Sequence, residues 1–147
     1  MSNKFALTSS SLAIALIFVA GSACAGPSDD ARTHFQAVAS GDTHVVMRGY
    51  ADQAQLNWVG GPLDGTYATT DTIRSTWEKF GKAVGPLKLT IGQIEESANP
   101  KGATVSANVL FEGKTPIKVR YVLTYREGKI VSETWQIDPK LVVAAAY

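Results

Sequence analysis

Hydrophobic positions recur with two different periods along this chain, and the change falls near Leu87. Upstream, most of them follow the 3.6-residue spacing of amphipathic helices; downstream, they alternate with polar residues as in half-buried strands. The helical spacing predicts helices over residues 29–40, about 43–48, and 70 to 82–85. The alternation predicts strands over residues 53–59, from 87 towards a turn at 99–102, and over 104–112, 117–126 and 129–138.

The third of these helices carries the clearest apolar stripe. Ile73, Trp77 and Phe80 stand at positions i, i+4 and i+7, so their side chains share one side. Thr70 is the expected N-cap. The strand that ends at Val59 is separated from this helix by several glycines and a proline, which indicate a turn-rich crossing. We therefore expect the helix to lie against a sheet.

Two features of the later strands predict the shape of that sheet. The apolar parity switches at Gly92-Gln93, which predicts a β-bulge and a bent strand. Glu127-Gly128 predicts a tight hairpin turn. Helices that come first and an antiparallel meander that comes last give the fold class α+β. We expect a curved antiparallel or mixed sheet wrapped around three N-terminal helices, in the form of a cone with an open interior.

The first 25 residues read as a signal peptide. Lys4 supplies a positive charge, residues 12–20 form an apolar run, and Ala23-Cys24-Ala25 is a small-residue cleavage site. Cleavage after Ala25 is favoured; lipidation at Cys24, through a loose lipobox, is the alternative. We therefore expect a periplasmic or secreted protein with one domain over residues 26–140 and a short tail over 141–147.

Composition excludes several function classes for the mature chain. Cys24 is the only cysteine, so ordinary cleavage leaves no thiol for catalysis or for a zinc–thiolate site. Lys4 is one of 14 basic residues, which leaves 13 bases against 13 acids and no basic stripe for nucleic acid. No transmembrane run follows the signal segment. The two histidines lack an acid at ligand spacing, and no Gly-rich phosphate loop is present, so we expect neither metal nor cofactor.

The order of elements, with several short motifs, resembles the SnoaL-like, nuclear transport factor 2-like superfamily, which includes ketosteroid isomerase. The matching segments are Ser40-Gly41-Asp42, Gly65-Thr66-Tyr67, the helix with Trp77, the run from Tyr125 to Ile130, and Trp135 to Asp138. The resemblance implies a curved sheet around a pocket, and often a homodimer packed through the outer sheet face. It implies no single activity.

The catalytic site of ketosteroid isomerase does not transfer to this sequence. That mechanism uses a carboxylate base, with a tyrosine and a protonated aspartic acid as oxyanion donors. The base would fall near Trp58 to Gly60, where no acid stands. The tyrosine would fall near His34 and the protonated acid near Tyr121. Isomerisation by that mechanism is therefore not expected.

Glu133 is the leading catalytic candidate because its strand pattern places it on the same face as Trp135 and Ile137. A carboxyl group among apolar side chains can act as a general acid or base, unless it pairs with an arginine or lies at the open rim. His34 lies in the apolar stripe of the first helix, either as a proton-exchanging group or as a satisfied core histidine. Tyr121 can donate its hydroxyl to a ligand.

The sequence thus predicts an exported domain that binds a small, largely apolar molecule in an internal pocket. Its expected wall is made by Trp58, Trp135, Leu123 and Ile137, and any catalysis is acid–base work by Glu133, His34 and Tyr121. One alternative is a binding protein without turnover. Another is an interaction module with a filled interior, which uses its outer sheet face for dimerisation.

Overall fold

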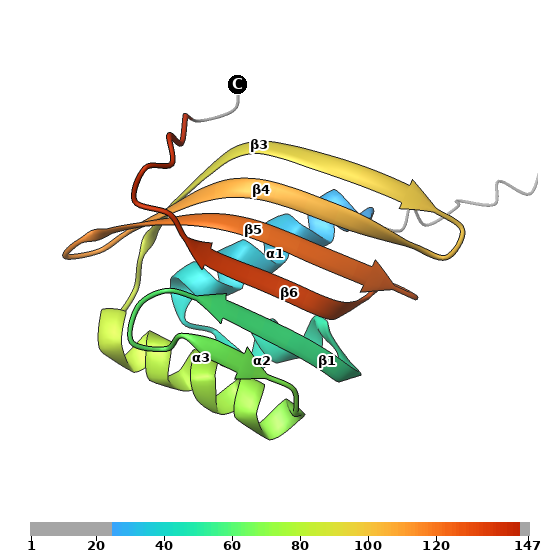
Figure 1. Cartoon of the computed structure of the whole chain (residues 1–147), viewed down its shortest axis with the longest axis horizontal. Helices are drawn as coiled ribbons and strands as arrows, with labels where there is room; N and C mark the ends of the chain where they lie inside the picture. The colour runs from blue at the N-terminus through green and yellow to red at the C-terminus, as the bar shows by residue number, and fades with distance from the viewer. Residues whose placement is uncertain (1–24, 145–147) are drawn as a thin grey trace, which may run out of the picture.

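The structure, a computed structural model, describes residues 25–144 and contains three helices and one six-stranded sheet in that range (Figure 1). The predicted signal segment up to Cys24 lies outside the described residues. The helices are α1 (Pro27–Ser40), α2 (Thr43–Arg48) and α3 (Thr70–Val84). The strands are β1 (Tyr50–Val59), β2 (Gly65–Tyr67), β3 (Lys88–Asn99), β4 (Gly102–Glu112), β5 (Pro116–Arg126) and β6 (Lys129–Ile137).

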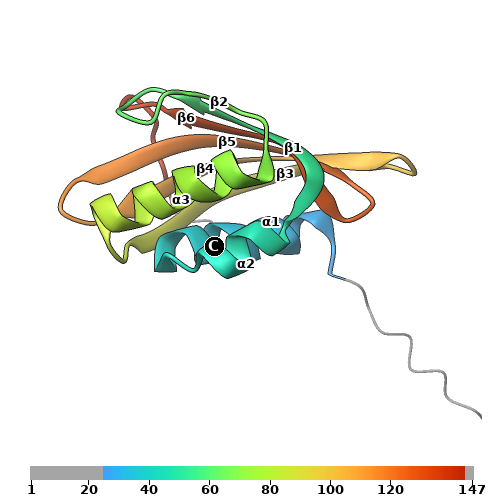
Figure 2. The same cartoon turned by 90° about the horizontal axis from the view of Figure 1, so that it is seen from below.

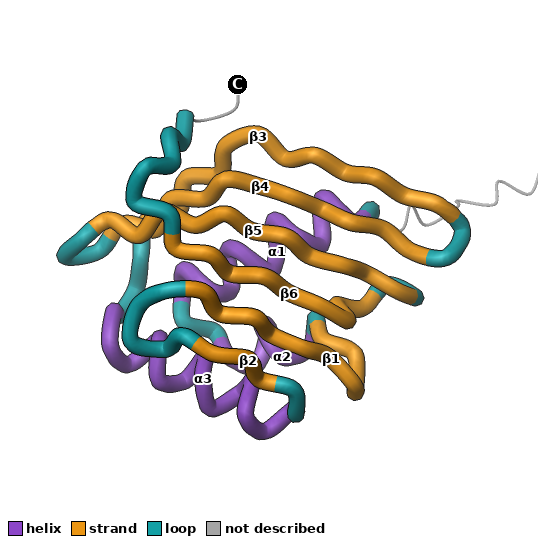
Figure 3. The backbone as a smooth tube through the Cα atoms, viewed as in Figure 1, coloured by secondary structure: helices purple, strands orange, loops and turns teal. Residues whose placement is uncertain are grey.

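The strands lie in the order β2-β1-β6-β5-β4-β3, which Figure 3 shows as a continuous series. Strand β1 pairs with β6 in parallel, and every other pairing in this sheet is antiparallel. The sheet is curved and not closed, with β2 and β3 at its edges. Helix α1 packs on β3 and β4, and α3 packs on β1 (Figure 2). The α+β class and the curved mixed sheet are confirmed.

Strand β2 was not predicted, because the glycines and the proline after Val59 indicated only an irregular crossing. The crossing instead folds back on itself: Gly60 and Gly61 adopt positive φ angles of 95° and 74°. The backbone N–H of Gly60 donates to the carboxylate of Asp64 over 2.7 Å. This turn lets Gly65 pair opposite Trp58, and it produces a three-residue edge strand.

The helix starts differ slightly from the predicted ones. Thr69, not Thr70, caps α3, because Thr69 is extended and its hydroxyl accepts from the backbone N–H of Thr72. Helix α1 begins two residues early, at Pro27, whose fixed φ suits a first helical position. Its N-cap Gly26 has no side chain to offer. The Glu96 carboxylate on β3 accepts from the backbone N–H of Ser28 over 2.9 Å and replaces that cap.

Both predicted irregularities of the later strands are confirmed. The β3–β4 register shifts between Ile91 and Ile94, at the position of the predicted bulge. Glu127 and Gly128 have φ angles of 51° and 73°, as a tight hairpin turn requires. The chain after β6 stays against the molecule as far as it is described: Leu141 is buried, and Val143 lies beside Gly92 at the bulge.

Candidate functional site

Glu133 is fully buried in the middle of the sheet. Its strand, β6, lies between β1 and β5, and its neighbours in register are Leu56 and Leu123, both also fully buried. A carboxyl group in such surroundings is costly unless donors compensate for the lost water. The donors therefore decide what Glu133 can do.

His34 is the first partner of this carboxyl group. Its Nε2 lies 2.9 Å from Oε1 of Glu133, and its side chain is 3% exposed. The bond joins α1 to β6 across 99 sequence positions. The two expected catalytic residues are thus in direct contact. Glu133 neither pairs with an arginine nor lies at the open rim, the two alternatives to a catalytic role. It is fully buried, and its two oxygens bond to His34 and Tyr50.

The second partner, Tyr50, was missed in the sequence. Its hydroxyl donates to Oε2 of Glu133, while the Trp77 indole N–H donates to the Tyr50 oxygen over 2.9 Å. Helices α1 and α3 are therefore both tied to one carboxyl group. The signal for Tyr50 was present: it shares the even-numbered parity of Leu56 and Trp58 on β1. Because Tyr50 directly follows Gly49, which ends the second helix, its position instead predicts a residue on the inner side of that helix.

Tyrosine hydroxyls surround the same carboxyl group. Burial, followed by the charge of Glu133, raises the pKa of Tyr50, Tyr121 and Tyr125. These hydroxyls therefore remain protonated and can act as donors. Tyr121 and Tyr125 have buried hydroxyls without a partner among the described protein atoms. The expected role of Tyr121 as a donor stays a prediction.

The space expected to be a hollow is occupied by aromatic rings. Trp58 and Trp135 stack with their centroids 4.6 Å apart, and Trp135 also stacks on Phe111 at 5.2 Å. Trp58, Trp135 and Leu123 are at most 3% exposed, and Ile137 lies near the turn at Gly60. None of five pockets among residues 25–144 is lined by these four predicted wall residues. Their ligand-binding role also stays a prediction.

Two pockets reach the Glu133 network: one is lined by Tyr50, and the other is lined by His34, between α1, α2 and the β5–β6 turn. The second has a volume of about 220 Å³ and is lined by His34, together with Asp30, Thr33, Val45, Arg48, Gly49, Tyr125, Gly128, Lys129 and Ile130. The unpartnered Nδ1 of His34 lies on the side of Gly49, where an added Cβ would stand 3.7 Å from it. We call this the His34 pocket.

Two kinds of feature are missing from the described part of the chain. Within residues 25–144, no helix combines the length and hydrophobicity needed to cross a membrane. The same residues contain no cluster of three or more histidine, cysteine or acidic side chains placed to bind a metal ion.

Solved structures show the same fold at low identity. An NTF2-like protein of unknown function from Pseudomonas putida has a TM-score of 0.63 and 19% identity, over 80% of this chain and 89% of that one. A candidate calcium/calmodulin-dependent protein kinase II association domain from Xanthomonas campestris has a TM-score of 0.62 and 20% identity, over 75% and 84%. A candidate polyketide cyclase from Sinorhizobium meliloti has a TM-score of 0.51 and 20% identity, over 74% and 94%.

No curated protein matches the sequence. The SnoaL-like domain family, in contrast, matches residues 31–133, a range that holds most of α1 and ends on Glu133 itself. This range is more than half of the 147-residue chain, and the structural neighbours agree with it in fold. The chain therefore belongs to the SnoaL-like domain family.

Proposed function

We propose that this protein is an exported domain that binds a small molecule in the His34 pocket and exchanges a proton with it through His34. Glu133 orients the imidazole and compensates its charge. One observation carries the proposal: His34 lines the pocket, bonds to a buried carboxyl group through Nε2 and has a buried Nδ1 without a partner among the described protein atoms.

The two ring nitrogens have different tasks in this arrangement. The proposal takes Glu133 as a carboxylate, which only accepts hydrogen bonds, and His34 as a neutral imidazole; the nitrogen that faces Glu133 then carries the hydrogen, and Nδ1 keeps a lone pair. A lone pair in that position can accept a proton from a bound molecule. The imidazolium that results is stabilised by Glu133, as in the histidine–carboxylate pairs of hydrolases. Tyr50 and Trp77 hold the carboxyl group in place from the other side.

The pocket favours a small ligand with an apolar body and one polar group. Its volume of about 220 Å³ lies below the ~300–1,000 Å³ of drug-sized sites. Val45 and Ile130 supply apolar wall, whereas Arg48 and Lys129 bring two positive charges to the lining, against one acid, Asp30. The Lys129 ammonium donates to the Arg48 carbonyl over 2.7 Å and fixes the mouth. Positive charge there would stabilise an anion formed when a C–H or O–H group loses its proton.

A ligand-independent assay for an accessible base can test this proposal. The probe is 5-nitrobenzisoxazole, a small, flat molecule: a base removes its ring C–H proton, the N–O bond breaks, and a coloured phenolate is released. We expect the chain from Gly26 onward to accelerate this reaction. His34→Gln should lower the rate by about 10²–10⁴-fold, the usual contribution of a positioned base. Glu133→Gln should lower it less, since it removes the support and not the base.

The other histidine provides the matched control. His44 is exposed at the start of α2, so His44→Gln removes an imidazole without touching the pocket. Equal rates for His34→Gln and the unmodified chain would reject the proposal, provided near-ultraviolet circular dichroism shows an intact tryptophan cluster.

N-terminal sequencing of protein recovered from the cell envelope tests export: a chain that begins at Met1 would reject it.

A second candidate function follows from the filled interior. The outer sheet face is then a second functional surface, and we propose it as a homodimer interface. Val122 is 37% exposed near the middle of that face, beside Ser106 and Thr134. Light scattering should then report a dimer for the mature chain and a monomer for Val122→Glu. A monomer for both chains would reject this candidate.

A further inference from the structure

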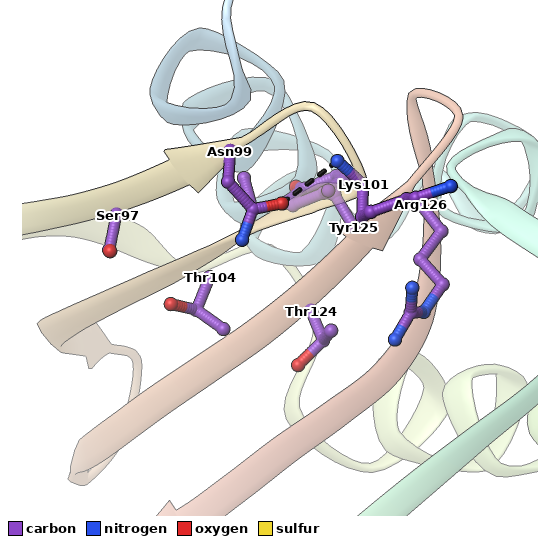
Figure 4. A pocket seen from close by; sticks show the side chains of 9 residues that line it. Ser97, Asn99, Lys101, Thr104, Thr124, Tyr125 and Arg126 are labelled. Atoms are coloured by element: carbon purple, nitrogen blue, oxygen red, sulfur yellow. Dashed lines mark hydrogen bonds between the residues drawn. The ribbon is translucent and has the colours of Figure 1, made fainter.

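A row of hydroxyl side chains crosses four neighbouring strands on the outer face of the sheet. Ser97 on β3 pairs with Thr104 on β4, which pairs with Thr124 on β5, which pairs with Ser132 on β6. Residues in register on one face of a sheet repeat at the strand spacing of about 4.8 Å. Figure 4 shows the first three side chains in a line. Such a row offers evenly spaced donors and acceptors to one ligand.

A pocket with a volume of about 200 Å³ lies along the first three residues of this row. Ser97, Thr104 and Thr124 line it together with two cationic residues, Lys101 and Arg126. Arg126 follows Thr124 by two positions on β5, so both point to the same face. In Figure 4 the Arg126 side chain is drawn beyond Thr124, on the side away from Thr104. The pocket therefore combines hydroxyl groups with positive charge.

The charges of this pocket are not balanced by its own wall. Within the described part of the chain, no aspartate or glutamate lines it, and neither cation takes part in an ion pair. Glu95 shares the outer face of β3 but lines a different pocket, together with Arg120. Glu127, the residue after Arg126, lines two adjoining pockets with Lys101 but not this one. Two cations in a wall without an acid create a local positive potential that attracts anions.

The turn that carries Lys101 is fixed by a side-chain hydrogen bond and by close contact with the backbone of β5. The side-chain carbonyl of Asn99 accepts from the Lys101 N–H over 2.8 Å. Gly102 follows at φ 156°, and a Cβ there would overlap the carbonyl oxygen of Tyr125. Glycine thus allows the β3–β4 turn to approach β5 closely. This approach brings Lys101 to the pocket that Arg126 enters from the other hairpin.

From this arrangement we infer a second binding site, for a small ligand that carries an oxyanion next to hydroxyl groups, the chemistry of a sugar phosphate. Lys101 and Arg126 bind the anion, and Arg126 can do so through two parallel N–H groups. The hydroxyls of Thr104 and Thr124 bond to the ligand hydroxyls. This site lies on the outer face of the sheet, whereas the Glu133 network lies on the inner face. It is therefore independent of the proton-exchange proposal.

Amide NMR titration of the mature chain tests this site, with glucose 6-phosphate as the probe and glucose as its neutral analogue. We expect saturable shifts at Thr104 and Thr124 with glucose 6-phosphate and none with glucose. The double substitution Lys101→Gln/Arg126→Gln should weaken binding at least ~10-fold, about 1.4 kcal/mol. Lys114→Gln is the control, because it removes one positive charge from the exposed β4–β5 turn. No saturable shift, or an unchanged affinity in the double variant, overturns the inference.

Inorganic phosphate and a second substitution test the hydroxyl row separately. Valine has the shape of threonine without its hydroxyl and suits a strand equally well. Thr104→Val/Thr124→Val should weaken glucose 6-phosphate several-fold and leave inorganic phosphate unchanged. If inorganic phosphate binds as tightly as the sugar phosphate, and the valine variant changes neither, the assignment of the hydroxyl row is wrong.

Discussion

The indole of Trp77 donates a hydrogen bond of 2.9 Å to the hydroxyl of Tyr50, and thereby links α3 to the carboxyl group of Glu133. With the His34 bond on the other oxygen, a continuous chain of hydrogen bonds runs from α3 through β1 and β6 to α1. Its members are all buried. Networks of this kind stabilise a fold when every member is satisfied, and they are costly when one is removed.

Tyr50→Phe should therefore destabilise the domain. The substitution leaves the Trp77 N–H without its acceptor and one Glu133 oxygen without its donor, in a buried site. We expect a loss of about 1–3 kcal/mol in the free energy of unfolding by urea. Tyr67→Phe is the control: its hydroxyl donates to the carbonyl of Leu63 in a partly buried site, so its removal should cost less. Equal losses would contradict the network.

Gly49→Ala should reduce proton abstraction without unfolding the chain. Gly49 has φ −71° and ψ −23°, which alanine adopts readily. Its new methyl carbon would lie 3.7 Å from Nδ1 of His34 and 3.3 Å from the carbonyl oxygen of Val46, so it narrows the pocket mouth. We expect the rate with 5-nitrobenzisoxazole to fall about tenfold, or ~1.4 kcal/mol in the barrier. An unchanged rate would mean that the probe reacts elsewhere.

Alkaline pH should unfold this protein in one step with tyrosine ionisation. Burial and then Glu133 raise the pKa values of Tyr50, Tyr121 and Tyr125 in the folded state, so the unfolded chain releases these protons first. Their contribution to stability is complete below the unfolded pKa of about 10 and is lost as the pH rises above it. Absorbance of phenolate should show that three of the five tyrosines ionise only with unfolding. Ionisation of all five before circular dichroism changes would contradict this.

Gly102→Ala should be far more costly than Gly128→Ala, although both glycines follow or form hairpin turns at one end of the sheet. At Gly102 a Cβ overlaps backbone of β5, which cannot move without breaking the β4–β5 register. At Gly128 nothing lies within 4 Å, and only the positive φ of 73° is unfavourable, by about 1–2 kcal/mol. Urea denaturation should show a difference of at least about 2 kcal/mol between the variants.

Glu96→Gln should weaken the start of α1. The carboxylate accepts from both the backbone N–H and the hydroxyl of Ser28, and it places negative charge at the positive end of the helix. Because the site is exposed, we expect the low end of the usual capping range, about 0.5–1 kcal/mol in urea denaturation. Glu95→Gln, on the neighbouring position of β3, makes the same charge change away from the helix. A larger loss for Glu95→Gln would argue against the cap.

Local pattern was sufficient for most of the secondary structure. The Gly92 parity switch predicted the bulge, and the Ile73–Trp77–Phe80 stripe predicted the buried face of α3, because both depend on neighbours a few residues apart. It was insufficient for β2, since a three-residue edge strand has no period of its own. The fold class followed from element order, and the family match agrees with it.

For the candidate site too, local pattern predicted some features and only the folded structure decided the others. The sequence alone placed Glu133 and His34 on apolar faces of their elements, because burial follows the period of a strand or helix. It could not pair them, since 99 positions separate the two residues and only the β1–β6 parallel pairing with α1 across the sheet brings them within 2.9 Å. Nor could it decide whether the interior is open. The size and packing of Trp58, Trp77 and Trp135 against one another fill that space, and packing of distant side chains is a property of the folded chain alone.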